Sequence, residues 1–242
     1  MPNAHQAVDN TRPGDWPHGF CIVPMIYSRD DLYQPGIPAV PGQHYRAFVR
    51  FALKYAGSGV LDLGCGFGAY LAALNEAGLT CFGCDINADY LRKASALGLP
   101  VANVDSLLPF RDRSFDTVVL FEVLEHVNDV NAVLREAFRV ARKNVLITVP
   151  NSENIEQLKQ NDVTYAHMLA SDHLHFFDPE SLEELLLRYG KSVSIDRGDP
   201  IYPFWFLSRS LPFRGLKVLF HFGLLKPRFF SRLYAVASVR EN

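Results

Sequence analysis

The sequence has no apolar run that reaches the roughly 18 residues of a membrane-spanning helix. Its first residues, Met1 to Trp16, are polar and contain prolines, and they lack the apolar core of a secretory signal peptide. These absences argue against a membrane-spanning or secreted protein and predict a cytoplasmic location. Hydrophobic residues make up 48 % of the 242 residues, which is enough to build the core of a globular domain.

Paired cysteines are scarce, and an excess of basic residues is lacking. Of the four cysteines, Cys81 and Cys84 form one C-x-x-C pair, and no second pair is present to complete a structural zinc site. We therefore interpret them as buried strand thiols. The 24 basic and 26 acidic residues give a formal net charge of −2, so the composition argues against a nucleic acid partner.

The most informative stretch that is present runs from Gly59 to Asp85. An apolar run is followed by alternating glycines at Gly64, Gly66 and Gly68 and then by a helix-period pattern, which predicts a strand, a tight turn and a helix. Such a turn lets a ligand approach bare backbone at a helix N-terminus. Asp85 ends the next predicted strand, where its carboxylate could accept hydrogen bonds from a ribose diol. The unit is typical of nucleoside binding.

The spacing of Gly64, Gly66 and Ala69 also fits the dinucleotide fingerprint, which by itself is a weak signal. Asp62 argues against that interpretation because it places a carboxylate inside an otherwise apolar strand, where burial is costly without donors. The segments downstream decide between the two.

These segments follow one another in a fixed order. They are Leu61-Asp62-Leu63-Gly64-Cys65-Gly66-Phe67-Gly68, Asp85, Asp105-Ser106-Leu107-Leu108-Pro109-Phe110, Phe115-Asp116-Thr117-Val118-Val119 and Glu122-Val123-Leu124-Glu125-His126. The ordered set resembles the class I S-adenosylmethionine-dependent methyltransferases, in particular the type 11 and type 23 small-molecule enzymes, over about residues 45 to 198.

The resemblance implies an α/β, Rossmann-like class I methyltransferase fold, with a seven-stranded, mainly parallel sheet, an antiparallel last strand and helices on both faces. It implies S-adenosyl-L-methionine as cofactor and S-adenosyl-L-homocysteine as product. Asp85 would hold the ribose, Asp105 and Ser106 the adenine, and Phe121 and Glu122 would wall the sulfonium. The full set of expected cofactor-binding residues is Asp62, Gly64, Cys65, Gly66, Gly68, Asp85, Ile86, Asp105, Ser106, Leu107, Phe121 and Glu122.

The chain divides into an irregular, proline-rich N-terminal leader or cap at residues 1–42 and a methyltransferase domain at residues 43–242. Residues 151–168 are polar and are interpreted as a lid. We expect helices at residues 43–55, 87–98, 129–142 and 178–189, and strands at residues 60–63, 80–84, 100–104, 115–121, 144–149, 191–197 and 233–239.

Three interpretations remain open for Glu122, Glu125 and His126, which follow the fourth predicted strand. They could cap a turn, or His126, His173 or His175 could act as a general base. Alternatively, Glu122, Glu125, His126 and His175 could hold a divalent metal, as in the small-RNA 3′-terminal 2′-O-methyltransferases, which have two glutamates and two histidines in this order. His173 and His175 would face opposite sides of an extended segment, so we expect only one of them in the site.

Residues 199–232 form a basic, aromatic insertion before the last strand. It could contact a membrane surface or form a homodimer interface, or it could complete the core. The sequence therefore predicts a methyltransferase (EC 2.1.1.-) that acts on an oxygen or nitrogen of a small-molecule, glycan or lipid-linked acceptor and that lies in the cytoplasm or peripherally at the membrane. The alternatives are a metal-dependent RNA 3′-terminal 2′-O-methyltransferase and a non-catalytic cofactor-binding protein.

Overall fold

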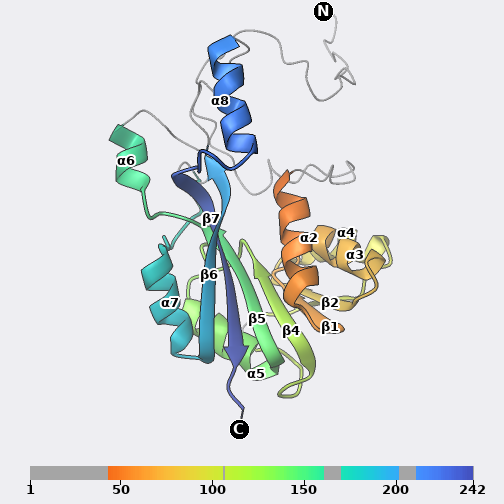
Figure 1. The fold of residues 1–242 in the computed structure, drawn as a ribbon. Coiled ribbons are helices and arrows are strands. Elements are labelled where there is room, and N and C mark those ends of the chain that lie inside the picture. Colours follow the sequence, from red (N-terminus) through yellow and green to blue (C-terminus); the bar gives the residue numbers. More distant parts are fainter. Residues whose placement is uncertain (1–42, 106, 161–169, 202–210, 242) are drawn as a thin grey trace, which may run out of the picture.

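A computed structural model describes residues 43–105, 107–160, 170–201 and 211–241 (Figure 1). The predicted leader at residues 1–42 lies outside the described residues. The elements are α2 (Gln43–Tyr55), β1 (Gly59–Leu63), α3 (Ala69–Glu76), β2 (Thr80–Asp85), α4 (Ala88–Ala96), β3 (Val101–Asn103), β4 (Phe115–Phe121), α5 (Val130–Val140), β5 (Ala141–Pro150), α6 (Ile155–Gln160), α7 (Pro179–Leu187), β6 (Gly190–Ile201), α8 (Leu211–His221) and β7 (Phe229–Val239).

The strands form one seven-stranded sheet in the order β3-β2-β1-β4-β5-β7-β6. β1 to β5 pair in parallel, and β7 is antiparallel to both β5 and β6. The predicted α/β class I architecture is thereby confirmed, including the antiparallel last strand. β1 lies between β2 and β4, so the strand order reverses there, and ligands of open α/β sheets bind at the carboxyl edge at such a point.

Helices cover both faces of the sheet (Figure 1). Phe48 of α2 and Leu71 of α3 pack into one buried cluster with β1 and β4 residues. Leu134 of α5 and Leu182 of α7 pack into a second cluster, which contains other residues of the same strands. This division follows from the alternation of side chains along buried strands. Two full cores hold the strand ends, and with them the site, in fixed positions.

The predicted helix caps are confirmed. The Asn87 side chain accepts hydrogen bonds from the backbone of Asp89 and Tyr90 at the start of α4. At α7, Asp178 and Ser181 form a reciprocal capping box, with Pro179 at the first helical position. α5 ends at Val140, two residues earlier than predicted, because Arg142 lies in β5 and its Nη2 atom pairs with Oδ1 of Asp116 at 2.7 Å.

The cysteine prediction is consistent with the structure. Cys81 and Cys84 are both buried in β2, and they belong to different core clusters on opposite faces of the sheet. Burial raises the pKa of each thiol to about 12. Both therefore behave as protonated core side chains at neutral pH.

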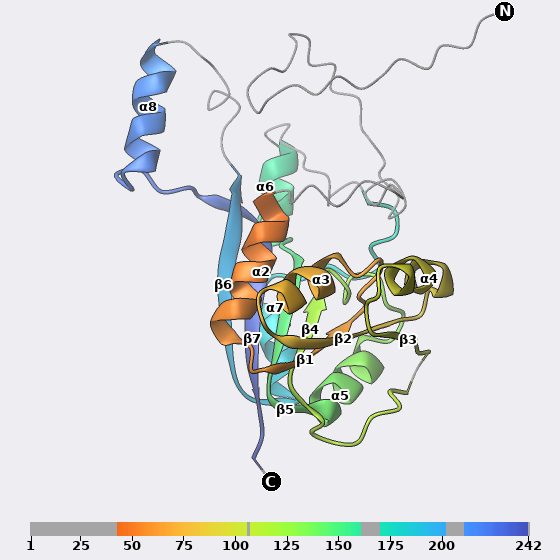
Figure 2. The same cartoon turned by 90° about the vertical axis from the view of Figure 1, so that its right-hand side faces the viewer.

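The predicted insertion is too wide at both ends. β6 extends to Ile201 and β7 begins at Phe229, so residues 199–201 and 229–232 belong to the sheet. Between them, residues 202–210 lie outside the described part, and α8 stands clear of the sheet in both views (Figures 1 and 2). None of the helices within the described ranges has the length and apolar character needed to cross a membrane. The predicted lid contains α6, and residues 161–168 of it are not described.

Candidate functional site

The turn after β1 is built on glycines in the left-handed region, with φ angles of 85° at Gly64, 53° at Gly66 and 79° at Gly68. At Gly64 a side chain is also sterically excluded, because a Cβ would lie 2.5 Å from Cγ2 of Val123. At Gly66 the opposite holds, since a Cβ there would meet nothing within 4 Å. The backbone of Gly66 thus faces open space, as the predicted ligand-binding turn requires.

Asp85 closes this turn from the neighbouring strand. Its Oδ2 accepts the backbone N–H of Gly66 at 2.8 Å, and its Oδ1 accepts the backbone N–H of Asn87 at 2.8 Å. A carboxylate has about four acceptor sites, so two remain for a ligand. Two acceptors at a strand end match the two hydroxyls of a ribose.

A pocket adjoins the turn and reaches the end of β4. It is lined by Gly64, Cys65, Gly66, Phe67, Ala69, Tyr70, Tyr90 and Phe121. The rings of Phe67 and Tyr90 are in contact at an angle of 45°, with centroids 4.2 Å apart, which joins the turn to α4. The structure thus brings Gly64, Cys65, Gly66 and Phe121 of the predicted set into one pocket.

Ile86 and Leu107 follow the carboxyl ends of β2 and β3, which pair so that Asp85 lies opposite Asn103. Their side chains are 69 % and 76 % exposed, which is unusual for large apolar residues. Asp105 is exposed beside them, and the predicted residue Ser106 lies outside the described residues. Apolar side chains flanking an acid at this edge suit a planar, partly polar ring such as adenine.

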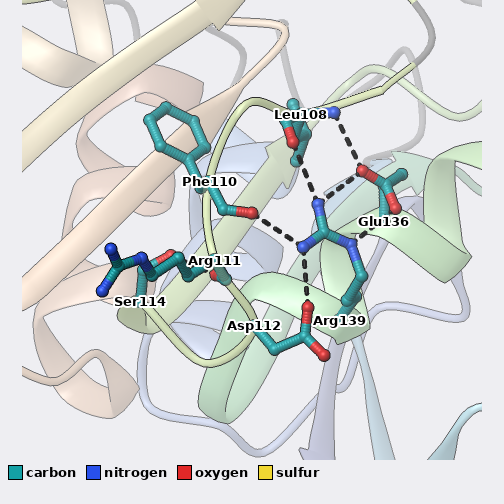
Figure 3. A network of polar contacts seen from close by, with 7 residues as sticks. All are labelled: Leu108, Phe110, Arg111, Asp112, Ser114, Glu136 and Arg139. Atoms are coloured by element: carbon teal, nitrogen blue, oxygen red, sulfur yellow. Dashed lines mark hydrogen bonds and ion pairs between the residues drawn. The ribbon is translucent and has the colours of Figure 1, made fainter.

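Arg139 of α5 holds the segment after Asp105 in place (Figure 3). Its guanidinium donates to the carbonyls of Leu108 at 3.0 Å and Phe110 at 2.7 Å and to both oxygens of Glu136. Glu136 in turn accepts the backbone N–H of Leu108 at 2.8 Å, and Arg139 beside it lowers the pKa of that carboxyl. This network fixes the course of the loop that carries Asp105 and Leu107.

Residues 61–149 match the family model of a methyltransferase domain, and this range contains the glycine turn, Asp85 and Glu122. The matched stretch, 89 of the 242 residues, is thus similar to methyltransferase domains. The chain is 34 % identical over 119 residues to a demethylmenaquinone methyltransferase of Mycolicibacterium paratuberculosis, covering 48 % of this chain and 52 % of that protein. It is 33 % identical over 103 residues to a ubiquinone biosynthesis O-methyltransferase of Methylococcus capsulatus, covering 39 % and 44 %.

Solved structures share the fold over most of the chain. A SAM-dependent methyltransferase from Archaeoglobus fulgidus superposes with a TM-score of 0.62 at 21 % identity, covering 82 % of this chain and 94 % of that one. A magnesium protoporphyrin IX methyltransferase from Synechocystis with bound SAH has a TM-score of 0.55 at 18 % identity, covering 82 % and 83 %. The chain spans about half the length of the curated relatives it matches. S-adenosylmethionine is the cofactor of this class.

The residues present fit that cofactor. Asp62 is 1 % exposed, and its Oδ2 has no hydrogen-bond partner among the described residues. A buried carboxylate oxygen beside an open glycine turn suits the cationic methionine end of S-adenosylmethionine. The two remaining acceptor sites of Asp85 suit the ribose, and Ile86 and Leu107 suit the adenine.

Asp62 gives a test of this arrangement. Burial, together with the nearby charge of Asp85, raises the pKa of Asp62 to about 7. Since this folded-state value lies above the ordinary 3.8, the fold binds the proton more tightly, and stability falls as the pH rises from about 4 to about 7. Asp62→Asn changes the free energy of unfolding at each pH. Without cofactor, this change should therefore be more stabilising at pH 8 than at pH 4, by roughly 2 to 4 kcal/mol. Urea unfolding at both pH values measures this difference.

Asp116 supplies a control, because its pKa is shifted in the opposite direction from that of Asp62. Its carboxyl accepts hydrogen bonds from Arg142, Ser58 and the Gly59 backbone, and Arg142 above all lowers its pKa. Asp116→Asn should destabilise the protein above pH 4 and matter less below it. An Asp62→Asn effect that is the same at both pH values would show that the Asp62 carboxyl is not protonated in the fold.

Glu122 occupies an unusual backbone position. It follows β4 with a φ of 55°, a left-handed conformation that is strained for a residue with a side chain, and its N–H donates to the carbonyl of Thr148 at 3.0 Å. Its Oε2 accepts from Nε of Arg232 at 3.0 Å. Asp199 also has a φ of 55°, and its Oδ2 accepts from Nη1 of Arg232 at 3.2 Å and from the hydroxyl of Tyr234 at 3.0 Å.

This buried network was not predicted. By its sequence Arg232 is the last residue of the basic, aromatic insertion at residues 199–232, whereas the structure places it in β7 with its side chain only 7 % exposed. One guanidinium therefore holds two strained acidic residues, one of them at the end of the strand that carries Phe121. The sequence did contain a signal for this pairing. No Asp or Glu occurs in the 41 residues after Asp199, so Asp199 is the last acid before Arg232.

The histidines separate into two groups. Nδ1 of His126 lies 3.1 Å from the carbonyl of Asp172 and 3.2 Å from its Oδ2, and the His126 and His173 rings are 4.9 Å apart. Because a carbonyl only accepts, Nδ1 of His126 carries the proton, so Nε2 is the basic atom of the neutral ring. His175, in contrast, donates from Nε2 to the carbonyl of Val127 at 2.9 Å, which is an anchoring contact.

The predicted metal set is assembled differently. Ligand atoms of Glu125, His126 and His173 lie within 4.8 Å of one another, so these three could hold a metal ion. His173 takes the place predicted for His175, and Glu122 is engaged by Arg232 instead. The expectation that only one of His173 and His175 belongs to the cluster agrees with this geometry.

Proposed function

We propose that this protein transfers the methyl group of S-adenosylmethionine to an oxygen, or a nitrogen, of a small-molecule, glycan or lipid-linked acceptor. The observation that carries the proposal is the Asp85 carboxylate, which closes the glycine turn and keeps two acceptor sites at the sheet edge. The quinone-pathway names of the curated relatives support an acceptor of small-molecule or lipid character. A non-catalytic binding protein would not need His126 and His173 side by side with buried Glu125.

Bound S-adenosylmethionine supplies a methyl group already activated by its sulfonium. The contribution of the protein is to align donor and acceptor, which can account for much of the rate enhancement. The glycine turn, Asp85 and Phe121 would fix the donor. Arg139 would support the adenine side, and Arg232 would hold Glu122 beside the donor.

His126 is the favoured general base. Asp172 orients its ring and, with buried Glu125, stabilises the imidazolium that forms when Nε2 takes a proton from an acceptor hydroxyl. Glu125 Oε1 lies 3.8 Å from Nε2, too far for a direct hydrogen bond but close enough to stabilise the charge. His173 is the second candidate.

Asp85→Ala tests the cofactor assignment. The change removes the expected ribose contacts and the anchor of the Gly66 amide, so we expect S-adenosylhomocysteine binding to weaken by about 1 to 3 kcal/mol. Isothermal titration measures the affinity. Asp89→Ala, a change at an exposed acid of the adjoining helix α4, is the control and should leave the affinity unaltered. Equal affinity of the Asp85 variant and the parent would refute the assignment.

The Glu125, His126 and His173 cluster favours one alternative, a metal-dependent 2′-O-methyltransferase of RNA termini. The same titration distinguishes it when EDTA-treated protein is titrated with Mn²⁺. A stoichiometric heat that His173→Ala abolishes would support the alternative, whereas the absence of any metal heat would favour His126 acting as a base without metal.

A further inference from the structure

We infer that α8 and the turn that follows it form a docking surface for an anionic lipid membrane. The surface is centred on an apolar patch, which we define as Val218, Leu219, Phe222, Leu224 and Leu225. These side chains are 50 %, 37 %, 72 %, 72 % and 37 % exposed, respectively. Such a concentration of large apolar side chains on one projecting element marks an interaction site rather than ordinary surface.

The patch is held in a defined shape. Gly223 ends the helix with a φ of 71°, and the amides of Leu224 and Leu225 both donate to the carbonyl of Leu219, at 2.9 and 3.2 Å. The glycine cap thus folds Leu224 and Leu225 back onto the last turn of α8. In both views α8 projects from the body of the domain, and the helices that cover the sheet leave it uncovered (Figures 1 and 2).

Positive charge surrounds the patch. Residues 200–240 contain seven Lys and Arg and no Asp or Glu, although the whole chain carries a net charge of −2. Arg232 is engaged by buried carboxylates, but Arg214, Lys226 and Arg228 are exposed beside the patch. Apolar side chains bordered by cations complement a bilayer whose surface is anionic and whose interior is apolar.

The same charge distribution argues against a second copy as the occupant. Pairing two α8 segments would bring like charges together, with no acidic residue of either segment to compensate them. The eleven residues of α8 are too few to span a bilayer, so the helix would lie in the interface.

Topology sets the orientation that docking would impose. Pro150, the last residue of β5, pairs with Arg232, and Ile201 pairs with Phe229, so the segment between them lies beyond the carboxyl edge of the sheet. The glycine turn and Asp85 lie on that same edge. Docking would therefore turn the site toward the lipid and favour an acceptor that resides in the membrane. This consequence rests on the proposed function, whereas the docking itself does not.

Vesicle flotation tests the docking without cofactor or acceptor. We expect the full chain to float with vesicles of phosphatidylcholine mixed with phosphatidylglycerol, and to float poorly with phosphatidylcholine alone. Binding should fall steeply at about 1 M salt, where the screening length is about 3 Å. The double variant Phe222→Ser and Leu224→Ser should lower the partition coefficient at least about tenfold, and Lys226→Glu should lower it at least about fivefold.

Two matched variants serve as controls. Leu97→Ser changes a leucine that is 74 % exposed at the end of α4, and Arg111→Glu reverses an exposed charge in the loop before β4, at the opposite edge of the sheet. Neither should change the partition coefficient. Failure to float with anionic vesicles would overturn the inference, as would equal binding to both kinds of vesicle. A solution dimer that the Phe222 and Leu224 changes dissociate would overturn it in favour of a homodimer interface.

Discussion

Replacing Arg232 with methionine should lower the free energy of unfolding by about 3 to 5 kcal/mol, because it removes the buried guanidinium that pairs with two largely buried carboxylates. Arg232 Nε lies 3.0 Å from Glu122 Oε2, and Nη1 lies 3.2 Å from Asp199 Oδ2. The guanidinium also lies over the Phe48 ring, 5.3 Å from its centroid, so methionine would keep part of the packing while losing the charge. Urea unfolding at neutral pH measures the loss.

A half-exposed arginine beside a buried carboxylate provides the comparison. Arg142 pairs with Asp116, but its side chain is 54 % exposed and Lys143 also lies 3.3 Å from the same carboxylate oxygen. Arg142→Met should therefore cost clearly less than Arg232→Met, because Ser58, the Gly59 amide and Lys143 still contact the Asp116 carboxylate. Adding Glu122→Gln and Asp199→Asn to Arg232→Met should restore most of the lost stability, because the uncompensated charges are then gone. If the triple variant is no more stable than Arg232→Met alone, packing rather than charge explains the effect.

Local patterns predicted much of the fold. Apolar periodicity gave α2 and β4 with the bounds that the structure shows, and the Asp178-Pro179 pair gave the start of α7. The glycine turn and the strand-end position of Asp85 were also predicted from the sequence, because both depend on local backbone conformation. Each of these features is encoded within a few neighbouring residues.

Features that depend on distant partners were missed. The predicted end of the α5 helix was too late because nothing near Arg142 shows that it pairs with Asp116 on the neighbouring strand. β6 was predicted too short because Gly198, Asp199 and Pro200 are typical of a loop. Cross-strand pairing with β7 and the contacts of Asp199 with Arg232 and Tyr234 extend it. Likewise, the choice of His173 over His175 depends on the hydrogen bond from His175 to Val127.

His126→Ala should lower kcat by about 10² to 10⁴ with a hydroxyl-bearing acceptor while leaving S-adenosylhomocysteine affinity unaltered. The reason is geometric: the Nδ1 atom is held by Asp172, so the unprotonated Nε2 is the atom that can take a proton from the acceptor. Release of S-adenosylhomocysteine, measured across a panel of small phenolic and hydroquinone acceptors, gives the rate. With parent enzyme the rate should rise with pH as an imidazole loses its proton, and this rise should disappear in the variant.

His175→Ala is the matched control, since it removes a histidine of the same segment whose Nε2 only anchors the chain to Val127. It should reduce stability modestly and keep both the pH rise and most of kcat. The kcat of Asp172→Asn should lie between those of the two histidine variants. The carbonyl of residue 172 still orients the ring, but the charge that stabilises the imidazolium is lost. A His126→Ala enzyme with parental kcat and an unchanged pH profile would remove His126 as the base and leave His173 as the remaining candidate. Since His173 lies against His126 on the side of Glu125, the rate of His173→Ala would then decide whether the cluster takes part in proton transfer at all.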